Sequence, residues 1–301
     1  MPTTTTVSLG DLVEETLDSL YRSAERPTQL VVGSDALDND SDTQFTLSLG
    51  SVNITDRVEG PAGELMLVTA KSADATPVYT VSRAYQNTTK ADQATGTVFL
   101  KNPPFTRSQV TRWIQRGVSS LMNAELPHWE TAEYTRHADF QYIELPADTL
   151  QVLRVRYFGL LEGRFSDVGG WEFQEVPTSL VTSGLVLRVS AVITVDDDLI
   201  VDVQRPYAWT GSGEAATVPL PVAAQDIPVL FASAYGQSRR EISRGELDKI
   251  EEWNQDQAIR AGVNLRMIRD MWGEVYRRVD EAKKIHRLPK TRPFNKMPKV
   301  W

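Results

Sequence analysis

Residues 98–121 read VFLKNPPFTRSQVTRWIQRGVSSL and contain the point at which the chain changes from β to helical structure. The apolar run Val98 to Leu100 predicts a short strand, and a helix begins after the prolines at 103 and 104. Thr106 is a suitable N-cap and Gln109 occupies the matching position of a capping box. The apolar face of this predicted helix comprises Val110, Trp113, Ile114, Val118 and Leu121.

The arginines of this helix fall outside its apolar face. Arg112 and Arg116 point away from it, so we expect them to meet solvent or a partner protein. Arg107 lies in the first turn, where we expect the helix end to leave it exposed. Trp113 is expected in the core, as is Trp253 further along the chain.

A β segment precedes the junction, between residues 29 and 101. Its clearest strand is residues 44–49, where Phe45, Leu47 and Leu49 alternate with polar residues at the period of a half-buried strand. Residues 65–69 and 78–81 predict two more strands, separated by a polar turn. Several short strands at this spacing indicate a small barrel or sandwich.

A second β segment follows the helix, over about residues 140–207. Apolar residues alternate along 152–158, 185–189 and 199–203. We expect 199–203 to pair with 191–195 across the acidic turn at 196–198.

Three further helices are expected. The first spans about Leu9 to Ser23, where Ser8 and Asp11 resemble a capping pair. Another runs from near Asp226 to about Ser243, and Gly245 is expected to break it. The last runs from about Glu246 to His286; its two apolar sets do not share one stripe, which indicates a bend near Gly262 or two buried faces.

These elements predict an α+β chain: a discontinuous helical bundle interrupted by two β-rich insertions, with an extended C-terminal tail. The expected domains are a helical core of residues 1–28, 102–125 and 224–286, a small β-barrel or sandwich at 29–101, a second β-rich insertion at 126–223, and a docking tail at 287–301.

Composition limits the functions available to the chain. It has 301 residues and no cysteine, which excludes disulfide scaffolds, thiolate metal sites and cysteine nucleophiles. No apolar run is long enough to span a bilayer, and the first residues lack the basic and apolar regions of a secretory signal. We therefore expect no leader segment.

Charge is distributed unevenly along the chain. The net charge is −8, yet seven basic residues and no acid lie from Lys283 to the end, which leaves −15 for residues 1–282. Prolines 289, 293 and 298 would keep this tail extended, and aromatic anchors are typical of interfaces. A docking tail is the favoured interpretation; a solvated terminus and a nucleic-acid contact of the tail alone are the alternatives. The docking residues are predicted to be Arg287, Lys290, Arg292, Phe294, Lys296 and Trp301.

Catalytic and metal-binding motifs are missing from the sequence. It contains no phosphate-binding loop, dinucleotide fingerprint, serine elbow or zinc-protease motif. Asp38, Asp40 and Asp42 begin like a calcium loop, but Thr43 and Leu49 stand where that loop needs glycine and glutamate. His128 and His137 have no nucleophile beside them and are read as structural. We predict no enzyme, no cofactor and no metal.

One stretch of the chain carries a family resemblance. The segments ELMLVT (64–69), YTVSRAY (79–85), NTT (87–89) and GTV (96–98), followed by NPPF (102–105) and a helix with Arg107, resemble neck proteins of long-tailed bacteriophages. In those proteins a histidine falls where Gln93 stands, and a glycine is common where Ala84 stands. The chain thus resembles a head-to-tail connector, or adaptor, over residues 60–120.

This resemblance implies a place in the virion. It implies a ring of about twelve copies below the portal, around the DNA channel, with the C-terminal segment docked on the portal protein and another neck or tail protein below. Such a protein is made in the bacterial cytoplasm and ends in the virion neck. An acidic body suits a channel through which DNA passes without sequence-specific binding.

Two other functions stay open from the sequence. A tail terminator or another neck ring belongs to the same class of structural virion proteins. A β-rich carbohydrate-binding module belongs to a different class, and glycan or calcium binding by the isolated protein would favour it.

Overall fold

Fifteen strands and four α-helices make up the described part of the chain. A computed structural model describes residues 4–22, 26–33, 37, 42–124, 126, 128–135, 142–159, 164–189, 198–248 and 255–285. The predicted fold class, a helical bundle with two small β insertions, is wrong. The chain is mostly β-rich, and each of its two β modules has a hydrophobic core of its own. The prediction gave the helices too much weight because amphipathic helices have a strong sequence periodicity, whereas short strands with register shifts have a weak one.

The first β module is a closed barrel with strand order β2-β3-β6-β5-β4-β7. Phe45 lies at its centre, with ring centroids 5.6 Å from Tyr79 and 5.4 Å from Phe99. Closure leaves no free edge, which explains why short strands suffice. The strands are β2 (Thr28–Val32), β3 (Gln44–Leu49), β4 (Arg57–Glu59), β5 (Leu65–Lys71), β6 (Val78–Ser82) and β7 (Val98–Lys101).

The second β module has two sheets that share one core. One sheet has the order β11-β10-β14-β8 and the other β12-β13-β9. Val201 and Val203 of β14 and Leu187 of β13 are fully buried in that core. The predicted partner of 199–203, residues 191–195, lies outside the described residues; β14 pairs with β8 and β10 instead. The strands are β8 (His128–Thr135), β9 (Tyr142–Glu144), β10 (Gln151–Gly159), β11 (Arg164–Asp167), β12 (Trp171–Glu175), β13 (Leu185–Val189) and β14 (Asp198–Arg205).

A two-stranded ribbon joins the start of the chain to the segment before the third helix. β1 (Thr4–Ser8) pairs antiparallel with β15 (Thr217–Pro221). The predicted helical core includes residues 1–28, with its helix only from about Leu9. The strand β1 was not predicted, because a run of threonines has no alternating apolar signal and its partner is distant in sequence.

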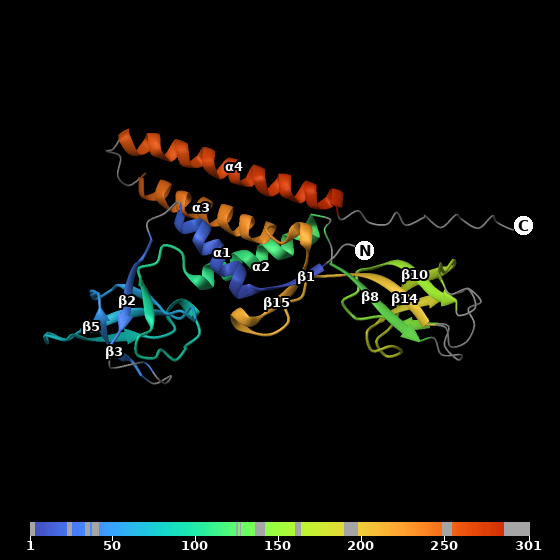
Figure 1. The fold of residues 1–301 in the computed structure, drawn as a ribbon, viewed down its shortest axis with the longest axis horizontal. Coiled ribbons are helices and arrows are strands. Elements are labelled where there is room, and N and C mark those ends of the chain that lie inside the picture. The colour runs from blue at the N-terminus through green and yellow to red at the C-terminus, as the bar shows by residue number, and fades with distance from the viewer. Residues whose placement is uncertain are drawn as a thin grey trace, which may run out of the picture.

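Three helices enclose the central core and a fourth lies along them. α1 (Leu9–Arg22), α2 (Arg107–Asn123) and α3 (Ile227–Asp248) bury apolar faces against one another, and α4 (Gln255–Ile285) packs along α3 (Figure 1). The expected break at Gly245 is wrong, since α3 continues to Asp248, and α4 begins at Gln255 rather than Glu246. One glycine inside a helix costs only about 1 kcal/mol relative to alanine, so Gly245 does not have to end the helix.

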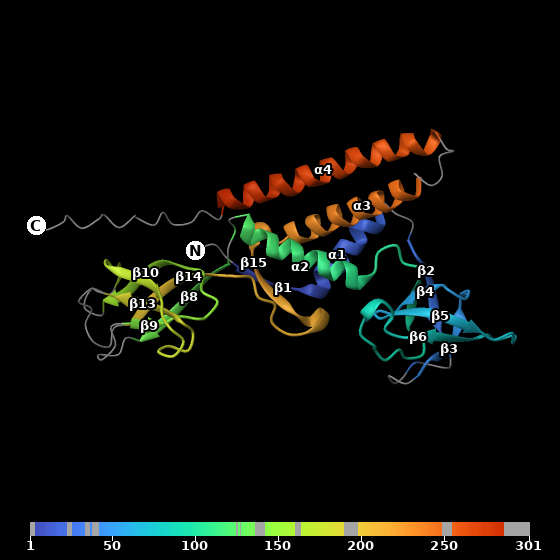
Figure 2. The ribbon, with the colours of Figure 1, turned by 180° about the vertical axis from the view of Figure 1, so that it is seen from behind.

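The two β modules lie at opposite ends of the helical layer (Figures 1 and 2). The helices therefore form the middle of an elongated molecule. Among the described residues, none of the helices combines the length and the apolar character that a membrane span requires.

The predicted capping box at the start of α2 is confirmed. Thr106 Oγ1 accepts a hydrogen bond from the Gln109 backbone N–H, and Gln109 Oε1 accepts one from the Thr106 N–H. Thr106→Ala should lower the free energy of unfolding by about 1 kcal/mol, because a helix N–H loses its acceptor. Ser119→Ala, on the exposed side of the same helix, is the control in a denaturant titration; equal losses for both variants would contradict the capping role.

Candidate interaction surfaces

The residues predicted to dock on the portal lie outside the described residues. These are Arg287, Lys290, Arg292, Phe294, Lys296 and Trp301. Asp38 and Asp40 of the acidic cluster also lie outside them, and within the described part of the chain no three metal-ligating side chains come together. The surfaces below are therefore built from the barrel, its junction with α2 and the helical layer.

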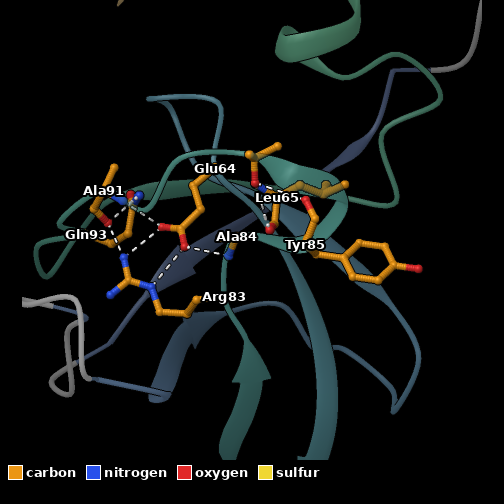
Figure 3. A network of polar contacts seen from close by, with 8 residues as sticks. Glu64, Leu65, Arg83, Ala84, Tyr85, Ala91 and Gln93 are labelled. Carbon is orange, nitrogen blue, oxygen red and sulfur yellow. Dashed lines mark hydrogen bonds and ion pairs between the residues drawn. The ribbon is translucent and has the colours of Figure 1, made fainter.

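A buried ion pair holds one end of the barrel (Figure 3). Glu64, just before β5, accepts hydrogen bonds from Arg83 at 2.9 Å to Oε1 and 2.7 Å to Oε2. The side chains of Glu64 and Arg83 are 0% and 2% exposed. Such two-point pairing fixes both side chains in one geometry.

The same carboxylate anchors the loop that follows β6. The backbone N–H groups of Ala84 and Ala91 both donate to Glu64. Gln93 Nε2 donates to the Ala91 carbonyl oxygen, 3.1 Å away. Burial opposes ionisation of Glu64, but the Arg83 and backbone hydrogen bonds outweigh it and hold its pKa below the usual value. Positions 84 and 93, where the sequence departs from the phage pattern, thus both touch this network.

The backbone at Ala84 explains why glycine suits that position. Its φ is 53°, in the left-handed region that glycine adopts without strain. Ala84 retains this conformation while its N–H bonds to Glu64.

Arg107 connects the barrel, α1 and the segment before β15. Its guanidinium donates to Glu214 through Nε at 2.7 Å and to Glu14 through Nη1 at 2.7 Å. Its backbone N–H donates to Glu59 Oε1 of β4 at 2.7 Å. The Arg107 side chain is only 12% exposed, so the expectation that it lies open at the helix end is wrong. Glu214 covers it, and no local pattern near residue 107 identifies that distant partner.

Glu59 is the unusual group of this junction. It is 1% exposed, and its Oε2 is a buried oxygen with no hydrogen-bond partner among the described residues. Burial raises the pKa of Glu59 to about 8, against the opposing influence of the Arg107 N–H and guanidinium. The carboxyl is therefore largely protonated at neutral pH, and the barrel meets α2 through a neutral acid.

An aromatic row crosses α2, α3 and α4. Trp113, Tyr235 and Phe231 follow one another with ring centroids 5.8 and 6.2 Å apart. Trp272 packs edge-on against Phe231 at 5.3 Å, and Tyr276 of α4 extends the row, 66% exposed. Trp113, which we expected in the core, is half-buried and contributes to both the core and this surface.

Arginines border one end of this row. Arg116 and Arg239 both donate to the Tyr235 hydroxyl and lie over its ring at 5.7 and 5.4 Å. The hydrogen bond from Arg239 lowers the pKa of that hydroxyl. Arg112 lies one turn before Arg116 and is exposed, as the sequence predicted for both. Rings flanked by arginine are common at the centre of protein interfaces.

Tyr235 and Arg239 were not among the predicted site residues. A signal was present, since they lie four residues apart and so share one face of a helix. Their meeting with Arg116 depends on the packing of α2 on α3.

No family model matches this chain, and no curated protein or solved structure matches it either.

Proposed function

We propose that this chain is a structural neck protein of a bacteriophage virion, a head-to-tail adaptor that forms a ring below the portal and docks on it through its C-terminal tail. It acts by assembly rather than by catalysis. DNA passes through the ring without sequence-specific contacts, and a further neck or tail protein binds below.

The observation that carries the proposal is that the elements of the segment resembling phage neck proteins are connected to one another by hydrogen bonds of buried side chains. Residues 60–120 contain β5 to β7 and most of α2. The buried Glu64–Arg83 pair holds the loop between β6 and β7. The Glu59–Arg107 contact then attaches the barrel to α2. The resembling segments thus make one continuous body, as expected of a module retained for assembly.

Charge distribution supports the same proposal. The body is strongly acidic and the tail is basic, proline-spaced and aromatic. An acidic body repels phosphate, which keeps translocating DNA from adhering. An extended tail with low ordering cost suits insertion into a groove of a neighbouring protein.

The direct test is negative-stain electron microscopy of the full-length protein mixed with portal rings of the same phage. We expect a second ring of density on one end of the portal. Bare portals beside protein that closes the end of a tail tube would favour a tail terminator instead.

Deleting residues 287–301 is expected to leave a folded protein that no longer binds the portal. The reason is that the basic and aromatic anchors are lost while every described element remains. Co-sedimentation with portal rings measures binding, and circular dichroism checks the fold. A chain with the same fifteen tail residues in reversed order is the control for charge alone; unimpaired portal binding by the deletion would refute the assignment.

A further inference from the structure

Two faces of the helical layer carry opposite charge. The acidic face is the outer side of α1 and consists of Asp11, Glu14, Glu15 and Asp18, all of them exposed. These residues share one face because they are spaced three, four and seven apart on the helix. Only Glu14 has an ion-pair partner among the described residues, Arg107, and its side chain remains 64% exposed.

The basic face is the outer side of α2 and α3 and consists of Arg112, Arg116, Tyr235 and Arg239. No acidic residue occurs anywhere in α2 or in residues 227–240 of α3. The face is therefore positive, without a compensating carboxylate in α2 or in that part of α3. Tyr235 gives it an apolar centre, continuous with the ring of Trp113.

The two faces lie on opposite sides of the layer. The buried side of α1 packs against Val110 and Ile114 of α2 and Val229 and Ala232 of α3, so the core separates the outer sides. α1 lies in front of α2 in Figure 1, and α2 lies in front of α1 in the reverse view of Figure 2. α4 lies along α3 at the top of the layer.

We infer that the basic face of one copy binds the acidic face of the next copy of this chain, which makes a head-to-tail contact that repeats around a ring. Every copy carries both halves of the contact, and a pairing of unlike faces is heterologous and closes by rotation. The inference specifies the subunit contact within the proposed neck ring and rests on that proposal only for closure around a channel.

The dimensions of the two faces are compatible. Asp11 to Asp18 spans about 10 Å of helix and Arg112 to Arg116 about 6 Å, so the two arginines of α2 fit within the length of the acidic face. The charges would steer and register the encounter, while the rings of Tyr235 and Trp113 supply desolvated area. Double-stranded DNA is the competing occupant of a basic face, and the test includes it.

The absence of cysteine allows a direct cross-linking test. A full-length chain carrying Glu15→Cys and Arg112→Cys should oxidise to a ladder of dimers, trimers and longer multimers. Each single-cysteine chain should give no dimer, because a head-to-tail contact never brings two acidic faces or two basic faces together. Asp74→Cys with Glu175→Cys, on exposed positions of the two β modules, is the matched control. A strong dimer from one single-cysteine chain, or a ladder no stronger than the control, overturns the inference.

Charge exchange provides a second readout. D11K/E15K/D18K and R112E/R116E/R239E should each weaken self-association on the order of 100-fold in analytical ultracentrifugation, because like charges are brought together. An equimolar mixture of the two variants should recover association, because the lysine variant then has basic faces and the glutamate variant has acidic faces that can bind them. D74K/D92K/E175K raises the net charge by the same amount as D11K/E15K/D18K and should have no effect. A mixture that fails to recover, or a basic face that retains duplex DNA while the chains stay monomeric, contradicts the proposed contact.

These results are separable from the proposed function. A ladder and a recovered mixture together with bare portals would support the copy-to-copy contact and reject the adaptor role. A ring of density on the portals without a cross-linked ladder would support the adaptor role and reject the copy-to-copy contact.

Discussion

Arg83→Met is expected to lower the free energy of unfolding by about 3–5 kcal/mol, the largest loss we expect from one substitution in the barrel. Methionine keeps much of the volume of the side chain but removes both hydrogen bonds to Glu64. The carboxylate is then buried without its counter-charge, and this desolvation is the main cost. Its bonds to the Ala84 and Ala91 N–H groups remain but cannot replace a guanidinium.

Arg154→Met is the matched control for this experiment. Arg154 also pairs with a carboxylate, Asp167, at 2.6 Å, but the arginine is 44% exposed. An exposed pair contributes about 0–1 kcal/mol, so the same substitution should cost little there. Denaturant unfolding followed by circular dichroism compares the two variants. Amide exchange at Ala84 and Ala91 should accelerate only in Arg83→Met, and equal losses of stability in both variants would show that the burial of the pair is unimportant.

The pH dependence of this pair has a definite sign. The folded-state pKa of Glu64 lies below its unfolded value, so the pair stabilises the fold above the unfolded pKa. That contribution is lost as the pH falls through the folded pKa. Arg83→Met should therefore lose less stability than the wild type on acidification.

Glu59→Gln is expected to remove a pH dependence of opposite sign. The folded-state pKa of Glu59 is about 8 and the unfolded value is near 4.5, so between these pH values the folded state holds a proton that the unfolded state releases. Wild-type stability should therefore decrease as the pH rises from about 4.5 to about 8, by on the order of 4 kcal/mol. Glutamine is neutral throughout, and its carbonyl oxygen can accept the Arg107 N–H as Glu59 Oε1 does.

The measurement is the free energy of unfolding at several pH values for the wild type and the variant. The two proteins should have similar stability near pH 5, and the variant should be the more stable near pH 8. Glu175→Gln, at an exposed position of β12, should follow the wild type. Parallel curves for wild type and Glu59→Gln would mean that Glu59 ionises normally in the folded protein.

The interior of the barrel and its junction with α2 are expected to contribute to stability independently of each other. The Glu64–Arg83 pair acts within the barrel, whereas Glu59 acts where the barrel meets Arg107.

Local chemistry made part of the fold predictable. The capping box of Thr106 and Gln109 and the apolar faces of α1 and α2 follow from residues three and four apart. Phe45 and Leu47 marked their strand by alternation with polar neighbours. Hydrogen bonds and periodicities of this kind involve near neighbours, so they can be recognised without knowledge of the tertiary structure.

The candidate surfaces were only partly predictable. The exposure of Arg112 and Arg116 followed from helical spacing, but the hydrogen bond from Arg116 to the Tyr235 hydroxyl did not. The docking residues of the tail stay a prediction from composition. The acidic face of α1 can be read from spacing, yet its position opposite the basic face requires the packing of three helices.

Amino-acid order was therefore sufficient for the starts of α1, α2 and α3, for the strand alternation, for the lack of cysteine chemistry and for the charge difference between body and tail. It was not sufficient for the closure of the barrel, the pairing of β1 with β15 or the burial of Arg107 by Glu214. The physical reason is the range of the interactions. Each of the latter joins segments far apart in the chain, and their pairing depends on which apolar surfaces bury one another, a choice made only when the whole chain is folded.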